Sequence, residues 1–161
     1  AWDWYHLEGL TDPAVQVWLL HLMALAGDLE EPELERLADR LMLAGEDRRL
    51  LVSFPARVEQ ARNRLRAPDL LPHQAVEALE PLGGEELLLL MADEDERVRA
   101  WVRRHLSELR SFELGIRGAD LVAAGVPPGP RIGEALKATK RARLDGRIEA
   151  GDELRFALEE I

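Results

Sequence analysis

The sequence predicts an all-α protein, in which a multi-helix body of packed helix pairs precedes a small helical tail unit rich in glycine and proline. Apolar residues recur at helical spacing along the chain. Strand patterns are nearly absent, because β-branched residues are few and no alternating run exceeds about five positions. Glycine and proline become dense after Ser111, so we assign residues 1–110 to the body and residues 111–161 to the tail.

Composition limits the class of protein. The chain has 161 residues, 47% hydrophobic and 32% charged, which suits one core or two small helical units. No apolar run reaches the ~20 residues that span a bilayer, so we expect no membrane contact. Cysteine is absent, which excludes disulfides and thiolate metal sites and fits a cytoplasmic location. Ala1 stands where a methionine would begin a protein, and we interpret it as either a remnant of cloning or a cut within a longer polypeptide.

The first two helices are expected between capping residues and glycines. Thr11-Asp12-Pro13 is a typical helix start, and the helix that follows runs to Gly27. Its residues are apolar nearly all round, which predicts a buried helix. A second helix begins at Glu31-Pro32 and stops at Gly45.

The rest of the body is expected to hold shorter helices. The helical pattern resumes near Asp47, and Pro55 is expected to break or kink it before a segment over residues 57–66. Further helices are predicted over about residues 72–82, 85–92 and 93–110.

The tail is ordered by turn-forming residues. Asp120 is placed to cap a short helix that Gly125 ends, because glycine adopts the left-handed conformation at low cost. Gly129-Pro130 opens a second helix, and Gly146 ends it. Gly133 leaves the first turn of that helix bare, so we expect another backbone to approach it closely.

The charge distribution favours a local basic surface in an acidic protein. The net charge of −10 argues against nucleic acid, yet residues 110–149 hold eight basic and five acidic side chains. The only lysines, Lys137 and Lys140, share a helix face with Arg141, away from the inner face of Ile132 and Leu136. This face is either a phosphate-binding surface or a solvated basic surface.

The tail carries a motif of some thirty residues that resembles a known family. The motif reads Gly118-x-Asp120-Leu121, then Gly125-x-Pro127-Pro128-Gly129-Pro130-x-Ile132-Gly133-x-x-Leu136, then Leu144-Asp145-Gly146. It resembles the C-terminal signature of bacterial poly(A) polymerases and CCA-adding enzymes, in particular the type fused behind DHH and CBS domains. The body, with Trp18-Leu19-Leu20, looks like the RNA-binding neck and body of that family. Ala119 departs from the family, which often carries a polar residue there.

The resemblance implies an RNA-holding role. In that family a head domain carries two metal-binding carboxylates and the nucleotide pocket, so ATP or CTP and Mg²⁺ are expected only in a head that lies outside this chain. The expected partners are tRNA or other RNA 3′ ends and the N-terminal catalytic domain of the same polypeptide. The residues expected to bind RNA are Arg131, Lys137, Lys140, Arg141, Arg99 and Arg103. The residues expected to shape the motif are Gly118, Asp120, Leu121, Gly125, Pro128, Gly129, Pro130 and Gly133.

One segment imitates a catalytic metal site. Gly83-Gly84 followed by Asp93-Glu94-Asp95 resembles the glycine pair and two acids of a nucleotidyltransferase head. The acids lack the apolar spacer that a strand would need, so we interpret them as a helix N-terminus. On the same helix Arg99, Arg103 and Arg110 lie on one stripe, which is either a row of phosphate-binding residues or a solvated or salt-bridged face. The histidines show no metal-ligand spacing.

The alternative function is a helical scaffold, similar to HEAT repeats, that binds protein without RNA. Its partner is another domain of the same polypeptide, a second copy in a homodimer, or a separate protein. The acidic total charge and the aromatic start, with Trp2, Trp4 and Tyr5, favour it. Salt-sensitive tRNA binding distinguishes the first function, and concentration-dependent association distinguishes the second.

Overall fold

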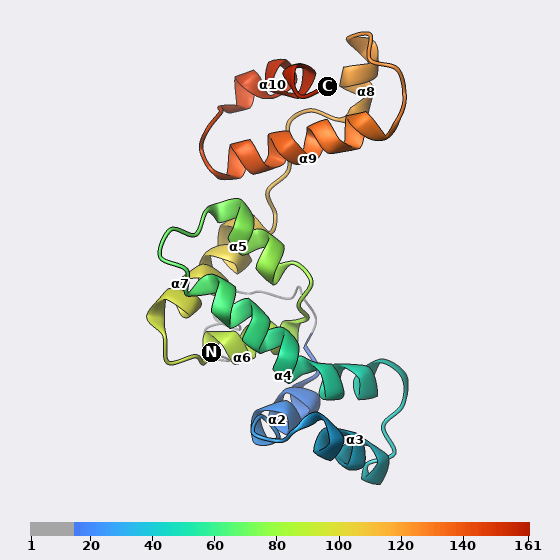
Figure 1. Cartoon of the computed structure of the whole chain (residues 1–161), viewed down its shortest axis with the longest axis vertical. Coiled ribbons are helices and arrows are strands. Elements are labelled where there is room, and N and C mark those ends of the chain that lie inside the picture. Colours follow the sequence, from blue (N-terminus) through green and yellow to red (C-terminus); the bar gives the residue numbers. More distant parts are fainter. Residues whose placement is uncertain (1–14) are drawn as a thin grey trace.

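The computed structural model describes residues 15–161, and this part of the chain is entirely helical (Figure 1). It contains nine α-helices, one π-helical turn, one 3-10 turn and no strand, which confirms the predicted all-α class. The expected helix start at Thr11-Asp12-Pro13 and the aromatic residues Trp2, Trp4 and Tyr5 lie outside the described residues.

The helices before the tail are short, apart from one. They are α2 (Val17–Leu25), α3 (Glu31–Arg40), α4 (Gly45–Leu65), α5 (Pro72–Leu79), α6 (Gly84–Met91) and α7 (Glu96–Arg104), followed by the π-helical turn η1 (His105–Leu109). Helix α3 starts where the sequence predicts, and the Glu33 carboxylate accepts a bond of 3.0 Å from the Glu30 amide. The segment predicted as one helix over residues 93–110 forms the α-helix α7 and then the π-helical turn η1.

Helix α2 corrects one prediction. It was expected to be buried because it is apolar all round, but only Leu19 and Met23 are buried. Trp18 is 47% exposed and Leu25 is 87% exposed. The physical reason is position, because α2 lies toward the end of the molecule that is remote from the tail (Figure 1) and its main helix contacts are with α4 and α6.

Helix α4 decides one part of the expectation for Pro55. Pro55 was expected to break or kink the helix, and α4 runs through it unbroken for 21 residues. Proline removes one backbone donor and crowds the preceding turn, which disfavours a helix interior. Here Leu51, Phe54 and Val58 are buried on both sides of Pro55, so tertiary packing holds the helix together across it.

The described residues form two hydrophobic clusters. The larger joins α2 to α7 and the π-helical turn, and Leu34, Leu51 and Leu90 within it have no exposed surface. The smaller consists of Leu121, Ala135 and Ala157, with partly buried neighbours such as Ile116 and Ile161. The division of the chain into two domains at Ser111 stays a prediction, which separate expression of residues 1–110 and 111–161 would test.

The tail helices surround the smaller cluster. They are α8 (Gly118–Ala123), α9 (Pro130–Leu144), the 3-10 turn η2 (Ala150–Asp152) and α10 (Glu153–Glu159). They gather at the end of the molecule opposite α2 and α3, and the chain reaches them through an irregular segment after η1 (Figure 1). Helix α9 lies against α5, so this pair of helices is where the tail meets the body.

Candidate RNA-binding surface

The glycines and prolines of the tail motif set the course of the backbone. Gly125 follows α8 with a φ of 97°, in the left-handed region, and Gly146 follows α9 with a φ of 68°. Both therefore end helices, as the sequence predicts. Gly129 precedes α9 and Pro130 is its first residue, after the turn that contains Pro128.

Asp120 caps the short helix, as predicted. Helix α8 begins at Gly118, so Asp120 does this from within the first turn. Its carboxylate accepts a bond of 2.7 Å from the Arg117 amide, so it still satisfies a backbone donor at the helix start. Leu121, the next residue, has no exposed surface and belongs to the smaller cluster.

The close backbone approach expected at Gly133 is absent, and a side chain instead lies close to Gly118. A β-carbon at Gly133 would meet no atom within 4 Å, so no other backbone lies against it. A β-carbon at Gly118 would lie 3.2 Å from the Ile132 Cγ2 atom. The motif thus needs a small residue where α8 starts, because α9 crosses there.

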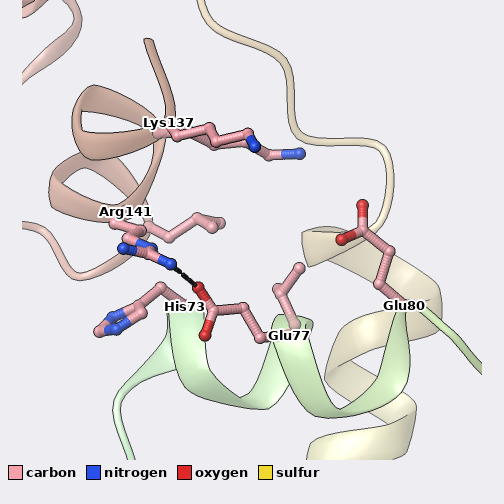
Figure 2. Close-up of a pocket in the computed structure, with 8 residues that line it drawn as sticks. His73, Glu77, Glu80, Lys137 and Arg141 are labelled. Carbon is pink, nitrogen blue, oxygen red and sulfur yellow. Dashed lines mark hydrogen bonds and ion pairs between the residues drawn. The ribbon is translucent and has the colours of Figure 1, made fainter. Parts of the chain in front are cut away.

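Three of the predicted RNA-binding residues line one groove. Lys137, Lys140 and Arg141, all on α9, line a cavity of about 450 Å³. Lys137 and Arg141 reach over it from α9 (Figure 2). Across it, α5 contributes His73, Glu77 and Glu80, and Val76 and Leu144 also line the cavity. Arg131 is exposed in the first turn of the same helix but does not line this groove.

Two contacts hold α9 against α5 beside the groove. The Arg141 guanidinium pairs with the Glu77 carboxylate, with Nε 2.7 Å and Nη2 2.6 Å from Oε1 (Figure 2). The His73 amide donates to Asp145 Oδ1 over 3.1 Å, and the His73 ring Nδ1 lies 2.6 Å from Oδ2. Asp145 directly follows α9, and His73 lies in the first turn of α5. The second contact therefore joins the end of one helix to the start of the other.

The two lysines are not engaged by these contacts. Among the described residues neither Lys137 nor Lys140 has an ion-pair partner. Arg141 is neutralised locally by Glu77 (Figure 2). The other acid that lines the groove with Lys137 and Lys140 is Glu80. The groove therefore offers two ammonium groups to an anion.

Arg99 and Arg103 lie elsewhere, on α7. Arg99 bonds to the Glu96 carboxylate and donates to the Asp93 carbonyl, and Arg103 Nη1 lies 3.1 Å from Glu96 Oε1. Hydrogen bonding from Arg99 holds the pKa of Glu96 below its usual value. Both arginines thus belong to a paired face of α7, and their contact with phosphate stays a prediction.

The acidic segment that imitates a metal site is a helix start, as interpreted. Asp95 precedes α7 and accepts 2.9 Å from the Arg97 amide. Asp93 pairs with Arg62, whose Nε lies 2.5 Å from Oδ2. Burial works to raise the pKa of Asp93, but the Asp95 amide and Arg62 outweigh it, and the pKa is lowered. No group of three or more metal-ligating side chains occurs between residues 15 and 161.

Sequence reasoning missed the α5 side of the groove. His73, Glu77 and Glu80 stand at spacings of four and three residues, so they share one helix face. Lys137, Arg141 and Leu144 repeat the same spacing on α9. The matching spacing was a usable signal, but the pairing of these two helices depends on tertiary contacts.

Within residues 15–161 no helix is long and apolar enough to cross a bilayer.

Comparison with known proteins places the chain beside tRNA nucleotidyltransferases. It is 30% identical over 162 aligned positions to an A-adding tRNA nucleotidyltransferase of Geobacter sulfurreducens, a match that covers 96% of this chain and 18% of that protein. It is 37% identical over 79 positions to a CCA-adding enzyme of Lacticaseibacillus paracasei, covering 49% of this chain and 19% of that protein. No family model and no solved structure matches the sequence. The chain is therefore homologous to a segment of these enzymes and spans less than a fifth of their length.

Proposed function

We propose that this chain is the non-catalytic, RNA-holding segment of a template-independent tRNA nucleotidyltransferase. The observation that carries the proposal is the similarity of nearly the whole chain to one segment of an A-adding tRNA nucleotidyltransferase. A catalytic domain elsewhere in the same polypeptide would supply the nucleotide and metal chemistry, and this segment would position the RNA 3′ end before it. The fused DHH-CBS arrangement and a poly(A) polymerase activity are narrower forms of the same proposal.

The groove between α5 and α9 supports this role by its charge. Lys137 and Lys140 are the cations along it that no acid pairs within the described residues, and Arg131 extends the basic surface along the same helix. Phosphates bound there would release counterions, which makes affinity depend on salt. The acidic remainder of a chain with net charge −10 would repel RNA and confine it to this surface.

A gel-shift with tRNA tests the proposal. With about three phosphates neutralised, affinity should fall roughly 40-fold between 50 and 200 mM salt. The triple variant K137A/K140A/R141A should bind at least about tenfold more weakly at low salt. Its matched control is R40A/R64A/R97A, which removes three exposed arginines that have no ion-pair partner among the described residues. Equal weakening in both triple variants would show that only total charge matters and would reject the groove.

A second candidate function is protein binding at the opposite end of the molecule. Leu25, the last residue of α2, is 87% exposed, and Met42, which follows α3, is 88% exposed. Large apolar side chains that are exposed to solvent can contribute to a protein interface. Sedimentation across a concentration series tests it, because self-association through this end should be abolished by L25S/M42S and not by the groove variants.

A further inference from the structure

The groove between α5 and α9 keeps three charged groups that the protein itself does not pair. Six polar residues line this groove. Three of them are engaged within the protein, because Arg141 pairs with Glu77 and His73 binds Asp145. The side chains that have no partner among the described residues are Glu80, Lys137 and Lys140. The groove thus presents two cations and one acid to a ligand.

The acid in this set is Glu80, the residue that directly follows α5. It lies three residues after Glu77, so the two acids share one face of the helix. Glu77 is occupied by Arg141, whereas the Glu80 side chain is exposed and lines the groove, where a ligand can reach it. Figure 2 shows the Glu80 and Lys137 side chains extending from the two helices into the same groove.

An acid beside the two lysines is a disadvantage for binding phosphate alone. A carboxylate repels a phosphate that lies near it, and this repulsion lowers the affinity that the lysine ammonium groups provide. An ionised carboxylate can only accept hydrogen bonds, and phosphate oxygens are acceptors as well. Glu80 therefore favours binding only when the ligand also carries a hydrogen-bond donor close to its phosphates.

RNA carries such a donor at every nucleotide. The ribose 2′-hydroxyl group can donate a hydrogen bond, it is present whatever the base sequence, and DNA lacks it. Base amino and imino groups are donors too, but they are common to RNA and DNA of the same sequence type. A carboxylate next to phosphate-binding lysines can thus distinguish the two kinds of sugar.

We infer that Glu80 makes the groove selective for RNA over DNA, by accepting a hydrogen bond from a ribose 2′-hydroxyl group while Lys137 and Lys140 bind neighbouring phosphates. The inference rests on the proposed RNA-holding function and names the residue that contacts the sugar. The groove volume of about 450 Å³ lies in the range of sites that hold one small molecule, so it admits a sugar with its phosphate. Val76 and Leu144 also line the groove and provide apolar surface for the sugar ring or base.

A hairpin with an unpaired 3′ end, made in three forms, tests the inference on the whole 161-residue chain. The three forms share one sequence and carry 2′-hydroxyl, 2′-O-methyl or 2′-deoxy sugars throughout. The methyl form lacks the hydroxyl donor but keeps the A-form geometry of RNA, so it separates the hydrogen bond from the shape of the strand. In gel-shifts at low salt the wild type should bind the hydroxyl form roughly tenfold more tightly than either other form, since a hydrogen bond to a charged group contributes on this scale.

Variants at position 80 distinguish recognition of the hydroxyl group from simple repulsion. E80A should bring the affinities for the three forms to a ratio of about one, because the acceptor is gone. E80Q loses the charge but keeps an amide oxygen that can accept, so it should retain part of the selectivity. The matched control is E160A, which removes an exposed acid that directly follows α10 as Glu80 follows α5. It should keep the wild-type ratio.

Two results would overturn the inference. One is equal binding of the three forms by the wild type. The other is a selectivity that survives in E80A while all three affinities rise by the same factor, because Glu80 would then act only as a repulsive charge.

The outcome also separates this inference from the proposed function. If tRNA binds, and the three hairpins compete with it equally or not at all, the sugar contact is rejected and RNA holding stands. If neither tRNA nor any hairpin binds at low salt, the RNA-holding proposal fails, and the role of Glu80 that rests on it fails as well.

Discussion

Arg143 on α9 and Glu153 at the start of α10 form a largely buried ion pair, with Nε 2.7 Å from Oε1. The second Glu153 oxygen accepts 2.8 Å from the Gly115 amide, in the irregular segment before α8. Arg143 also donates to the Ile148 carbonyl over 3.2 Å and lies over the Phe112 ring. One carboxylate therefore joins three separate parts of the tail.

Removing that carboxylate should destabilise the protein. In E153A the Arg143 guanidinium would stay largely buried without its acid, which should cost about 3 kcal/mol. Urea unfolding followed by circular dichroism measures the loss. The control is E159A on the same helix, whose exposed pair with Arg155 spans 4.0 Å. It should cost less than about 1 kcal/mol, and equal losses would contradict the assigned role of Glu153.

Stability should depend on pH through His105. The folded ring stays neutral down to about pH 4, whereas the unfolded ring titrates near 6.5. Between these values the unfolded chain binds a proton that the folded chain does not, so stability falls as pH decreases. The loss from this residue is about 3 kcal/mol by pH 4.

The variant H105L should lack this component. Its stability relative to the wild type should therefore rise steadily as the pH falls from 7 to 4, measured by urea unfolding at several pH values. H21A changes an exposed histidine and should keep the wild-type pH profile. A constant difference between H105L and the wild type would disprove the neutral buried ring.

The two motif glycines should respond oppositely to alanine. A β-carbon at Gly118 would meet Ile132 at 3.2 Å, so G118A should destabilise by about 1 kcal/mol. A β-carbon at Gly133 lies in open space within α9, so G133A should stabilise by about 0.5–1 kcal/mol. Thermal melts of the two variants give the comparison, and destabilisation by G133A would reveal a neighbour that the structure does not show.

The contact between α5 and the end of α9 should control how firmly the tail is held. D145A removes the acceptor of both His73 bonds. Trypsin should then cleave faster at Arg110 and Arg117, which flank the segment between body and tail. E77A, which breaks only the exposed pair with Arg141, should change the cleavage rate less. Unchanged cleavage in D145A would mean that other contacts hold the tail.

Local patterns predicted the tail better than the body. Gly125, Gly129-Pro130 and Gly146 mark helix ends by their own backbone preferences, so the sequence sufficed there. Pro55 and the exposed side of α2 depend on which neighbours surround them, and no local pattern encodes that.

The candidate site also contains features that local sequence predicts and features that depend on tertiary packing. The basic face of α9 follows from helical spacing, and the sequence alone identified Lys137, Lys140 and Arg141. The opposing acids on α5 reach this face only when distant segments pack together. Arg99 and Arg103 pair with Glu96 on their own helix. Their contact with phosphates stays a prediction.

The charged contacts between α5 and α9 affect how a binding experiment is interpreted. Added salt screens Arg141 from Glu77 as well as phosphates from lysines. A titration with salt would thus weaken the contact between α9 and α5 while it displaces RNA. The apparent number of released ions would then exceed the number of phosphates that the protein contacts. A disulfide-locked tail would separate the two quantities, because its salt dependence would report the phosphates alone.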